Sequence, residues 1–184
     1  MLKFDGKAGL KPFEKSAIVL LWVRCLVGMG EHKQALSVCE FNKKVILDDV
    51  EFHEICGNLQ LEIGNKKDAV KSYEALLALN PANFDTYYHL IDAAKGKVTF
   101  MADDKPNLAS AKFSAEDEAL FLETLEFYQT KYPRINAPTR IAMKISRGDA
   151  FKNYLHFFVK ALLIKGAPSV MTDLKELYAD KEKV

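Results

Sequence analysis

The side chains that could carry acid–base, nucleophilic or metal chemistry are few in this sequence and far apart. The four histidines are His32, His53, His89 and His156. None of them has another His or Cys at the spacing with which a helix holds zinc. No serine lies in a Gly-x-Ser-x-Gly turn and no phosphate-binding loop is present. We therefore predict no catalytic residue, no metal site and no cofactor, and we expect the histidines to be structural or surface residues.

The cysteines also lack a chemical pattern. They are Cys25, Cys39 and Cys56. All three occupy apolar positions within helical patterns, and no Cys-x-x-Cys pair occurs. An odd number without framework spacing predicts buried, reduced thiols of a cytosolic protein.

One glycine-containing stretch, RCLVGMG at 24–30, partly matches the loop with which acetyltransferases bind the pyrophosphate of acyl-CoA. That loop places Arg or Gln three residues before a Gly-x-Gly, whereas Arg24 lies four residues before Gly28. It also follows a strand, whereas AIVLLWV continues with the periodicity of a helix. The stretch is better explained as a turn between two helices than as a cofactor site.

A run of basic residues is the remaining local signal. Between 127 and 148 there is no acidic residue and there are five basic ones, namely Lys131, Arg134, Arg140, Lys144 and Arg147. On an irregular segment these cations could meet RNA phosphate or an acidic partner. The alternative is a solvated loop whose cations pair with Asp and Glu of neighbouring helices, at about 0–1 kcal/mol per pair. Both interpretations stay open.

The elements that would position these residues are helices that repeat with a regular period. A helical pattern over 66–80 must end before Pro81, because proline lacks an N–H donor and clashes with the preceding turn. Gly30 and Gly64 are 34 residues apart, and so are Ala35 and Ala69. A period of about 34 residues with a helix–turn–helix unit is typical of tetratricopeptide repeats.

The second of these units contains two further details of that repeat. Gly57 lies where the two helices must approach closely, and Ala69 is small for the same reason. Tyr73 is expected to fill the groove beside Gly57. Each hairpin has two apolar faces and must therefore stack on a neighbour. An ordinary helical bundle is the alternative.

We thus predict an all-α fold, a tetratricopeptide-like α-α superhelix of about seven helices with one long inserted loop. The left-handed conformation at Gly64 should close the helix over 51–63. A helix start is expected at Ser114. The predicted parts of a single solenoid segment over 1–184 are repeat 1 (13–47), repeat 2 (48–81), a degenerate repeat 3 (82–133) with the loop 96–114, an extended basic linker (134–147) and a C-terminal helical hairpin (148–184).

Composition narrows the class of protein. Among 184 residues, 49% are hydrophobic, 28% are charged and the net charge is +1, so no overall field attracts DNA or anionic lipid. The longest apolar run, 17–23, is far shorter than the roughly 20 residues of a membrane span. The N-terminus lacks the apolar core of a signal peptide. We expect a cytoplasmic protein that binds neither membrane nor DNA.

Several longer stretches resemble a specific family. They are YEALLALNPANFDTYYHLIDAAKGK, EFYQTKYPR, ISRGDAFKNYLHFFVKALLIKGAPSV and LKELYADKEK. In this order, from about residue 13 to the C-terminus, they resemble the auxiliary subunit of N-terminal acetyltransferase A. Three departures are the long segment 96–114, Thr139-Arg140 where the family has paired arginines, and a length several times shorter than that of the family, which indicates a fragment.

The resemblance implies a non-catalytic scaffold. Auxiliary subunits of this family form a helical solenoid around the catalytic acetyltransferase subunit and tether it to the ribosome for co-translational N-terminal acetylation. The implied partners are the catalytic subunit and the ribosome, with the five basic residues above as a candidate contact to ribosomal RNA.

A stand-alone tetratricopeptide adaptor for protein–protein interaction is the alternative function. Adaptors of that kind hold a peptide carboxylate with Lys and Asn on successive first helices. The corresponding positions here are Phe52, His53, Cys56, Tyr87 and Ile91. These side chains do not form a basic clamp.

Overall fold

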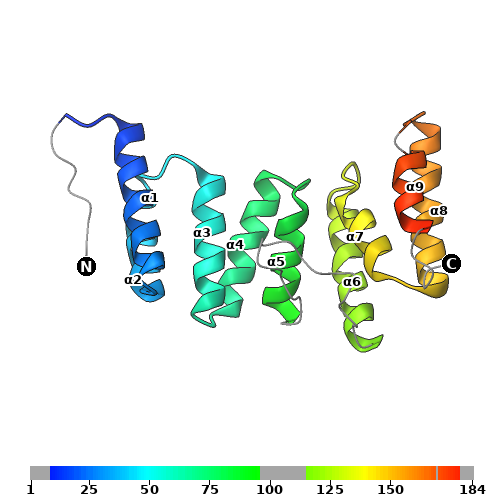
Figure 1. The fold of residues 1–184 in the computed structure, drawn as a ribbon, viewed down its shortest axis with the longest axis horizontal. Helices are drawn as coiled ribbons and strands as arrows, with labels where there is room; N and C mark the ends of the chain where they lie inside the picture. Colours follow the sequence, from blue (N-terminus) through cyan, green and yellow to red (C-terminus); the bar gives the residue numbers. More distant parts are fainter. Residues whose placement is uncertain (1–8, 96–114, 169, 179–184) are drawn as a thin grey trace. The chain divides into compact units, whose positions relative to one another are not determined.

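The computed structural model describes residues 9–95, 115–168 and 170–178, and helices account for most of them (Figure 1). They are α1 (Pro12–Gly28), α2 (His32–Phe41), α3 (Asp49–Glu62), α4 (Lys66–Leu79), α5 (Phe84–Lys95), α6 (Ala115–Lys131), α7 (Ala137–Ile145), α8 (Gly148–Ile164) and α9 (Val170–Tyr178). No strand occurs in these ranges, which confirms the all-α prediction. The nine helices of the described ranges exceed the predicted count of about seven.

The described chain divides into two compact units. The first unit holds α1 to α4 and the second holds α6 to α9, while the division passes through α5. The predicted loop 96–114 and the predicted helix start at Ser114 lie outside the described residues. The proposed repeat boundaries and the single solenoid segment stay predictions.

In the first unit, two helices end with the same pattern of backbone hydrogen bonds. At the end of α3, the N–H of Gly64 donates to the carbonyl of Leu61 at 2.9 Å, and the N–H of Asn65 donates to that of Gln60 at 2.8 Å. Gly64 has φ +84°, in the left-handed region that residues with a Cβ rarely adopt. Gly30, with φ +77°, ends α1 in the same way. The predicted left-handed glycine is confirmed, and the same motif recurs at the 34-residue spacing.

The close approach expected at Gly57 is also present. A Cβ added to Gly57 would lie 2.7 Å from Cε1 and 2.8 Å from Cζ of Tyr73. The ring of Tyr73 is fully buried, and its hydroxyl donates to Oδ1 of Asn58 at 2.6 Å. Only a residue without a side chain therefore lets α3 and α4 pack around this tyrosine.

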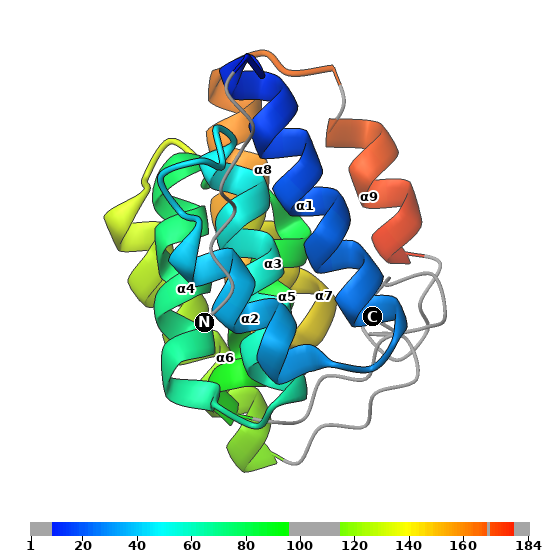
Figure 2. The same cartoon turned by 90° about the vertical axis from the view of Figure 1, so that its left-hand side faces the viewer.

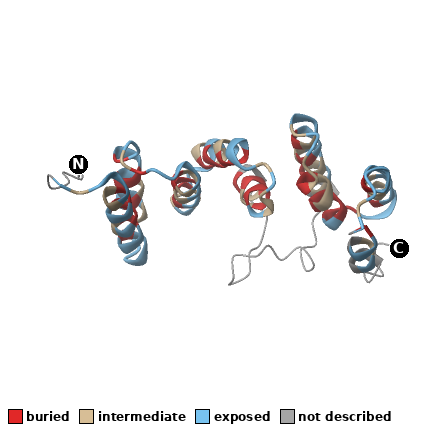
Figure 3. Cartoon of the chain, turned by 90° about the horizontal axis from the view of Figure 1, so that it is seen from above, coloured by how far each residue is buried: buried red, intermediate tan, exposed pale blue. Residues whose placement is uncertain are grey.

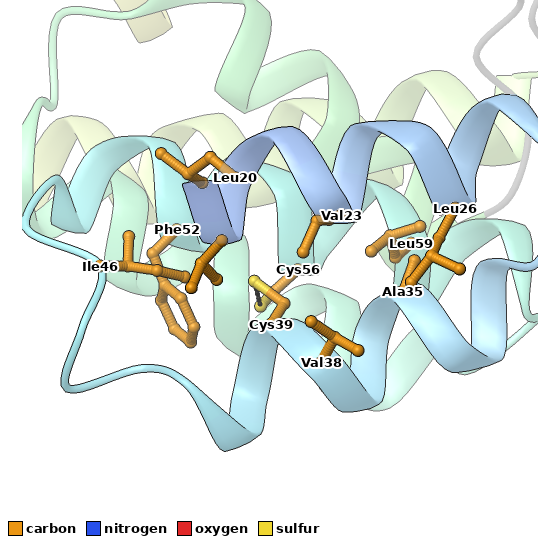
Figure 4. Packing of buried hydrophobic residues seen from close by; sticks show 11 residues of the cluster. Leu20, Val23, Leu26, Ala35, Val38, Cys39, Ile46, Phe52, Cys56 and Leu59 are labelled. Atoms are coloured by element: carbon orange, nitrogen blue, oxygen red, sulfur yellow. Dashed lines mark hydrogen bonds between the residues drawn. The ribbon is translucent and has the colours of Figure 1, made fainter. Parts of the chain in front are cut away.

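Side chains from α1, α2, α3 and the segment between α2 and α3, most of them aliphatic or sulfur-containing, form a continuous core in the first unit (Figure 4). Figure 2 shows the ribbons of the three helices that contribute to it. Its buried members are Val19, Leu20, Val23, Leu26, Ala35, Val38, Cys39, Ile46, Phe52, Cys56 and Leu59. Polar contacts fix its edges, because Ser16 Oγ accepts the N–H of Leu47 at 3.1 Å and Arg24 forms an ion pair with Glu51. The helices have buried and exposed sides, as expected for amphipathic hairpins (Figure 3).

The second unit packs through larger rings. Phe121 and Leu125 of α6 are buried, as is Ile141 of α7. The ring of Tyr87, at the start of α5, meets that of Tyr128 edge to face at 5.7 Å. The hydroxyl of Tyr87 donates to the carbonyl of Pro81 at 2.9 Å.

The segment 134–147 corrects a prediction. It was expected to be extended, but Ala137–Ile145 forms the helix α7. Pro138 lies in the first turn, where its missing N–H costs no hydrogen bond. Ile141, Ala142 and Ile145 are all buried, which is the spacing of a helix face. Ala142 and Met143 are both buried, so burial does not alternate along this segment as it would along a half-buried strand.

Candidate partner-binding surface of the C-terminal helices

Two of the five predicted basic residues lie against aromatic rings. The ammonium of Lys131 lies 5.6 Å from the ring centroid of Tyr132 and 5.7 Å from that of Tyr128. The guanidinium of Arg140 lies 5.5 Å from the ring of Phe158, and Arg140 is half-buried. Cation–π contacts of this kind stabilise a structure by about 0.5–2 kcal/mol. These two cations therefore contribute to packing inside the second unit.

The other three, Arg134, Lys144 and Arg147, are exposed. Lys144 is in the last turn of α7, where a cation interacts favourably with the helix dipole. Arg147 is the N-cap residue of α8 and has extended backbone. Four of the five predicted cations are thus exposed and Arg140 is half-buried, while Lys131 and Arg140 are the two that lie on aromatic rings.

A groove of about 450 Å³ lies between α6, α7 and α8. Its apolar floor includes Leu125, Pro138, Ala142, Phe157, Phe158 and Ala161. Its polar lining includes Glu126, Gln129, Asn136, Thr139, Tyr154 and Lys165. Apolar walls with a few placed polar groups are usual for binding sites of this volume.

Side-chain hydrogen bonds hold the polar lining in place. The hydroxyl of Tyr154 donates to Oε1 of Glu126 at 2.5 Å, and that of Thr139 donates to Oε1 of Gln129 at 2.6 Å. Burial, followed by the bond to Glu126, raises the pKa of Tyr154 above its ordinary value. Tyr154 therefore stays a neutral donor, and α8 is tied to α6 through it.

Sequence reasoning did not find this groove, because its walls come from three helices. The exposed ring of Phe157 would have been the available signal. Phe157 directly precedes the buried Phe158, lines the same groove, and is 71% exposed. Large exposed apolar side chains often mark interaction sites.

The positions compared with an adaptor clamp serve the core instead. Phe52 and Cys56 are buried in the first unit, and Tyr87 and Ile91 are buried as well. His53 is half-buried, and its pKa is lowered by burial and by nearby Lys43, against the opposing effect of Asp49.

Two of the three thiols are buried, as predicted, and lie together. The thiol of Cys56 donates a hydrogen bond to Sγ of Cys39 at 3.6 Å, and neither cysteine forms a disulfide. The contact with Cys39 and burial raise the pKa of Cys56. Cys25 corrects the prediction, because it is exposed on α1. In the described part of the chain, no three His, Cys, Asp or Glu side chains meet as a metal ion would require.

The stretch 24–30 forms the end of α1 and its glycine turn, in line with the interpretation as a turn. Among the residues that the structure describes, no helix combines the length and the apolar character needed to cross a membrane.

Helical hairpins whose first helices end with the same left-handed glycine turn, 34 residues apart, define a tetratricopeptide-like scaffold. The chain belongs to the family described as "N-terminal acetyltransferase A, auxiliary subunit", whose sequence model matches residues 13–184.

Named relatives and a solved structure agree with this assignment. The chain is 25% identical over 170 residues to the Arabidopsis thaliana N-terminal acetyltransferase A complex auxiliary subunit NAA15, which covers 92% of this chain and 18% of the relative. It is 26% identical over 172 residues to the mouse N-alpha-acetyltransferase 16, NatA auxiliary subunit, covering 94% of this chain and 18% of the relative.

A chain in the structure of Naa15/Naa10 bound to HypK-THB superposes with a TM-score of 0.78 at 26% identity. The match covers 97% of this chain and 24% of that one. The present chain therefore spans about a fifth of the length of the relatives it matches.

Proposed function

We propose that this chain is part of a non-catalytic scaffold subunit that binds the catalytic subunit of N-terminal acetyltransferase A. The main support is the match of 97% of the chain to a chain of the Naa15/Naa10 structure. Stacked hairpins offer a large preformed surface, so a partner binds with little ordering cost.

The first experiment uses the full-length gene product as bait in its source cell. We expect a separate acetyltransferase subunit to co-purify, while the 184-residue chain alone transfers no acetyl group to N-terminal peptides. Acetyl transfer by the isolated chain, or the absence of an acetyltransferase from the captured proteins, would contradict the proposal.

We further propose that the scaffold helps anchor the complex at the ribosome in the cytoplasm, for acetylation during translation. The exposed Arg134, Lys144 and Arg147 support this, because exposed cations can meet RNA phosphate. Lys131 and Arg140 are less suited, since they already lie on aromatic rings.

The test is ribosome co-sedimentation of the full-length protein at low and high salt. The triple variant Arg134→Gln, Lys144→Gln and Arg147→Gln should reduce binding and flatten its salt dependence, because each phosphate contact adds a counterion-release contribution. A matched control removes the same charge from the exposed Lys33, Lys66 and Lys67 of the first unit. Equal losses in both variants would point to a general charge effect and would count against the assignment.

A further inference from the structure

Two thiols of the first unit are in contact where one helical hairpin meets the next. Helices α1 and α2 form the first hairpin, and α3 and α4 form the second. Cys39 belongs to α2 and Cys56 belongs to α3, so the hydrogen bond between their sulfurs at 3.6 Å joins the two hairpins. Figure 4 shows this contact inside the apolar core.

The surroundings of the two thiols make them unreactive while the first unit is closed. Cys39 is 0% exposed and Cys56 is 2% exposed, and both belong to the core cluster of this unit. The contact with Cys39, followed by burial, raises the pKa of Cys56. Because the thiolate is the form that attacks a disulfide, the pair can react only when the unit opens and water reaches it.

We propose that Cys39 and Cys56 form a redox-sensitive cross-link, a disulfide that joins α2 to α3 when a low-molecular-weight disulfide oxidises them. In the opened unit, the thiolate of one cysteine attacks a sulfur of the small disulfide and releases one small thiolate. The thiolate of the other cysteine then attacks the mixed disulfide and releases the second. Both protons pass from the cysteines to the released thiolates. Two cysteines are thus oxidised, and one small disulfide is reduced to two thiols.

The geometry of the core suits this bond. A disulfide bond is about 2.05 Å long, so the two sulfurs must approach each other by about 1.5 Å. The bond shortens an existing contact and adds no atom, and it therefore needs no extra space in a packed core. The third thiol does not compete for either sulfur inside the core, because Cys25 is exposed on α1.

The expected consequence is a more stable junction between the hairpins. Cys39 and Cys56 are 17 positions apart, and a bond between them restricts the unfolded chain more than the folded chain, in which the sulfurs already meet. The stability of stacked repeats depends on the interfaces between neighbouring units. Oxidation should therefore keep the two hairpins together where the reduced junction opens. The inference goes beyond the scaffold function and does not rest on it.

The test uses the whole 184-residue chain with Cys25→Ser, which leaves Cys39 and Cys56 as the only thiols of the sequence. The chain is equilibrated with mixtures of reduced and oxidised glutathione, in native buffer and in concentrated urea. After an acid quench, mass spectrometry gives the fraction that is lighter by two hydrogen atoms. The equilibrium constant for the disulfide should be at least about tenfold larger in native buffer, because the fold holds the two sulfurs together.

A second pair of thiols in the same fold is the matched control. Cys39→Ala in a chain that keeps Cys25 leaves Cys25 and Cys56. One of these is exposed and the other is buried, so the fold does not favour a bond between them. Their equilibrium constant should be no larger in native buffer than in urea. An equal gain for both pairs would contradict the special role of the contact between Cys39 and Cys56.

The stability of the oxidised chain is the second measurement. Trp22 packs against the same core, so its fluorescence follows the first unit during urea denaturation. The disulfide should raise the urea midpoint, and dithiothreitol should return it to the value of the reduced chain.

Three results would overturn the proposal. One is an equilibrium constant for Cys39 and Cys56 that is no larger in native buffer than in urea. Another is the accumulation of glutathione adducts in native buffer without the disulfide between the two cysteines. The third is a lower urea midpoint in the oxidised chain, which would show that the two thiols serve packing alone.

Discussion

The cores of the two units of this protein are filled by different kinds of side chain. In the first unit, aliphatic residues and two buried thiols make up most of the core. The first helix of each of its two hairpins ends with the same glycine turn. One buried polar pair there lies within the unit, because Ser72 Oγ donates to Gln60 Oε1 at 2.7 Å. In the second unit, aromatic rings carry much of the packing, and cations lie on several of them.

The difference separates structural from interaction roles. A repeat that keeps its period has little freedom at three of its glycines, because Gly57 meets the ring of Tyr73, and Gly30 and Gly64 have left-handed backbone. A region that departs from the period can present side chains that its own core does not need, and the groove between α6, α7 and α8 lies in this region. We therefore expect substitutions in the first unit to act on stability, and those on the surface of α8 to act on binding.

The largest effect on stability is expected for Phe121→Ala in the second unit. The ring is fully buried in the described structure, and its removal should lower the free energy of unfolding by about 3–5 kcal/mol. Urea denaturation followed by far-UV circular dichroism measures this loss. The control Phe127→Ala removes a ring that is 60% exposed from the same helix and should cost about 1 kcal/mol or less. Similar losses in the two variants would contradict the packing assigned to α6.

In the first unit, Gly57→Ala should cost about 2–3 kcal/mol, because its new methyl group meets the rigid ring of Tyr73. The fluorescence of Trp22, the one tryptophan of the sequence, reports on this unit during urea denaturation. Gly28→Ala is the control, since a Cβ at Gly28 would have no atom within 4 Å. It should be neutral or slightly stabilising. In the Gly57→Ala chain, replacing Tyr73 with Leu should restore part of the lost stability. In the wild-type chain the same replacement should bring no gain in stability.

A smaller loss of stability, similar in the two units, is expected when a left-handed glycine at a helix end is replaced. Gly64 and Gly166 have φ +84° and +65°, and each is followed by the same pair of backbone hydrogen bonds at a helix end. Substitution of either glycine by alanine imposes a left-handed conformation on a residue with a Cβ, at about 1–2 kcal/mol. Thermal unfolding of the two variants should show similar shifts. A shift at Gly64 alone would mean that the C-terminal turn contributes little to the second unit.

Much of the first unit could be predicted from the sequence, because its signals are local. Pro81 marks a helix end by its own covalent structure, and the 34-residue spacing of Gly30 and Gly64 identifies the repeat. The partner of Gly57 could be predicted as well, since the repeat brings Tyr73 to it.

The second unit could be predicted less well, because its features depend on neighbours distant in the sequence. The segment 134–147 was predicted to be extended, although Pro138 is compatible with the first turn of a helix, where proline is favoured. The four-residue spacing of Lys152, His156 and Lys160 is visible in the sequence, but a second groove, which these residues border, also needs Leu174 from α9. Likewise, the contact of Arg140 with Phe158 joins two helices and has no local pattern.

The smallest effect on stability, but a direct comparison of the units, is expected from thiol labelling. All three cysteines of the sequence lie in helices of the first unit. Maleimide can therefore modify a thiol only where it is exposed on that unit or becomes accessible when the unit opens. Cys25 is exposed and should react quickly, whereas Cys39 and Cys56 are buried and should react only through opening. Mass spectrometry should therefore find one modified thiol in the native chain and three in urea. The substitution Cys25→Ser should change the free energy of unfolding by less than about 0.5 kcal/mol, because the side chain is exposed.

Labelling of the substituted chains then sharpens the comparison. Gly57→Ala should accelerate the modification of Cys39 and Cys56, because it raises the population of the open first unit. Phe121→Ala should accelerate it much less despite its larger loss of free energy, since its cavity lies in the other unit. Equal acceleration would show that the chain opens as one cooperative body, and the division of roles between the two units would then fail.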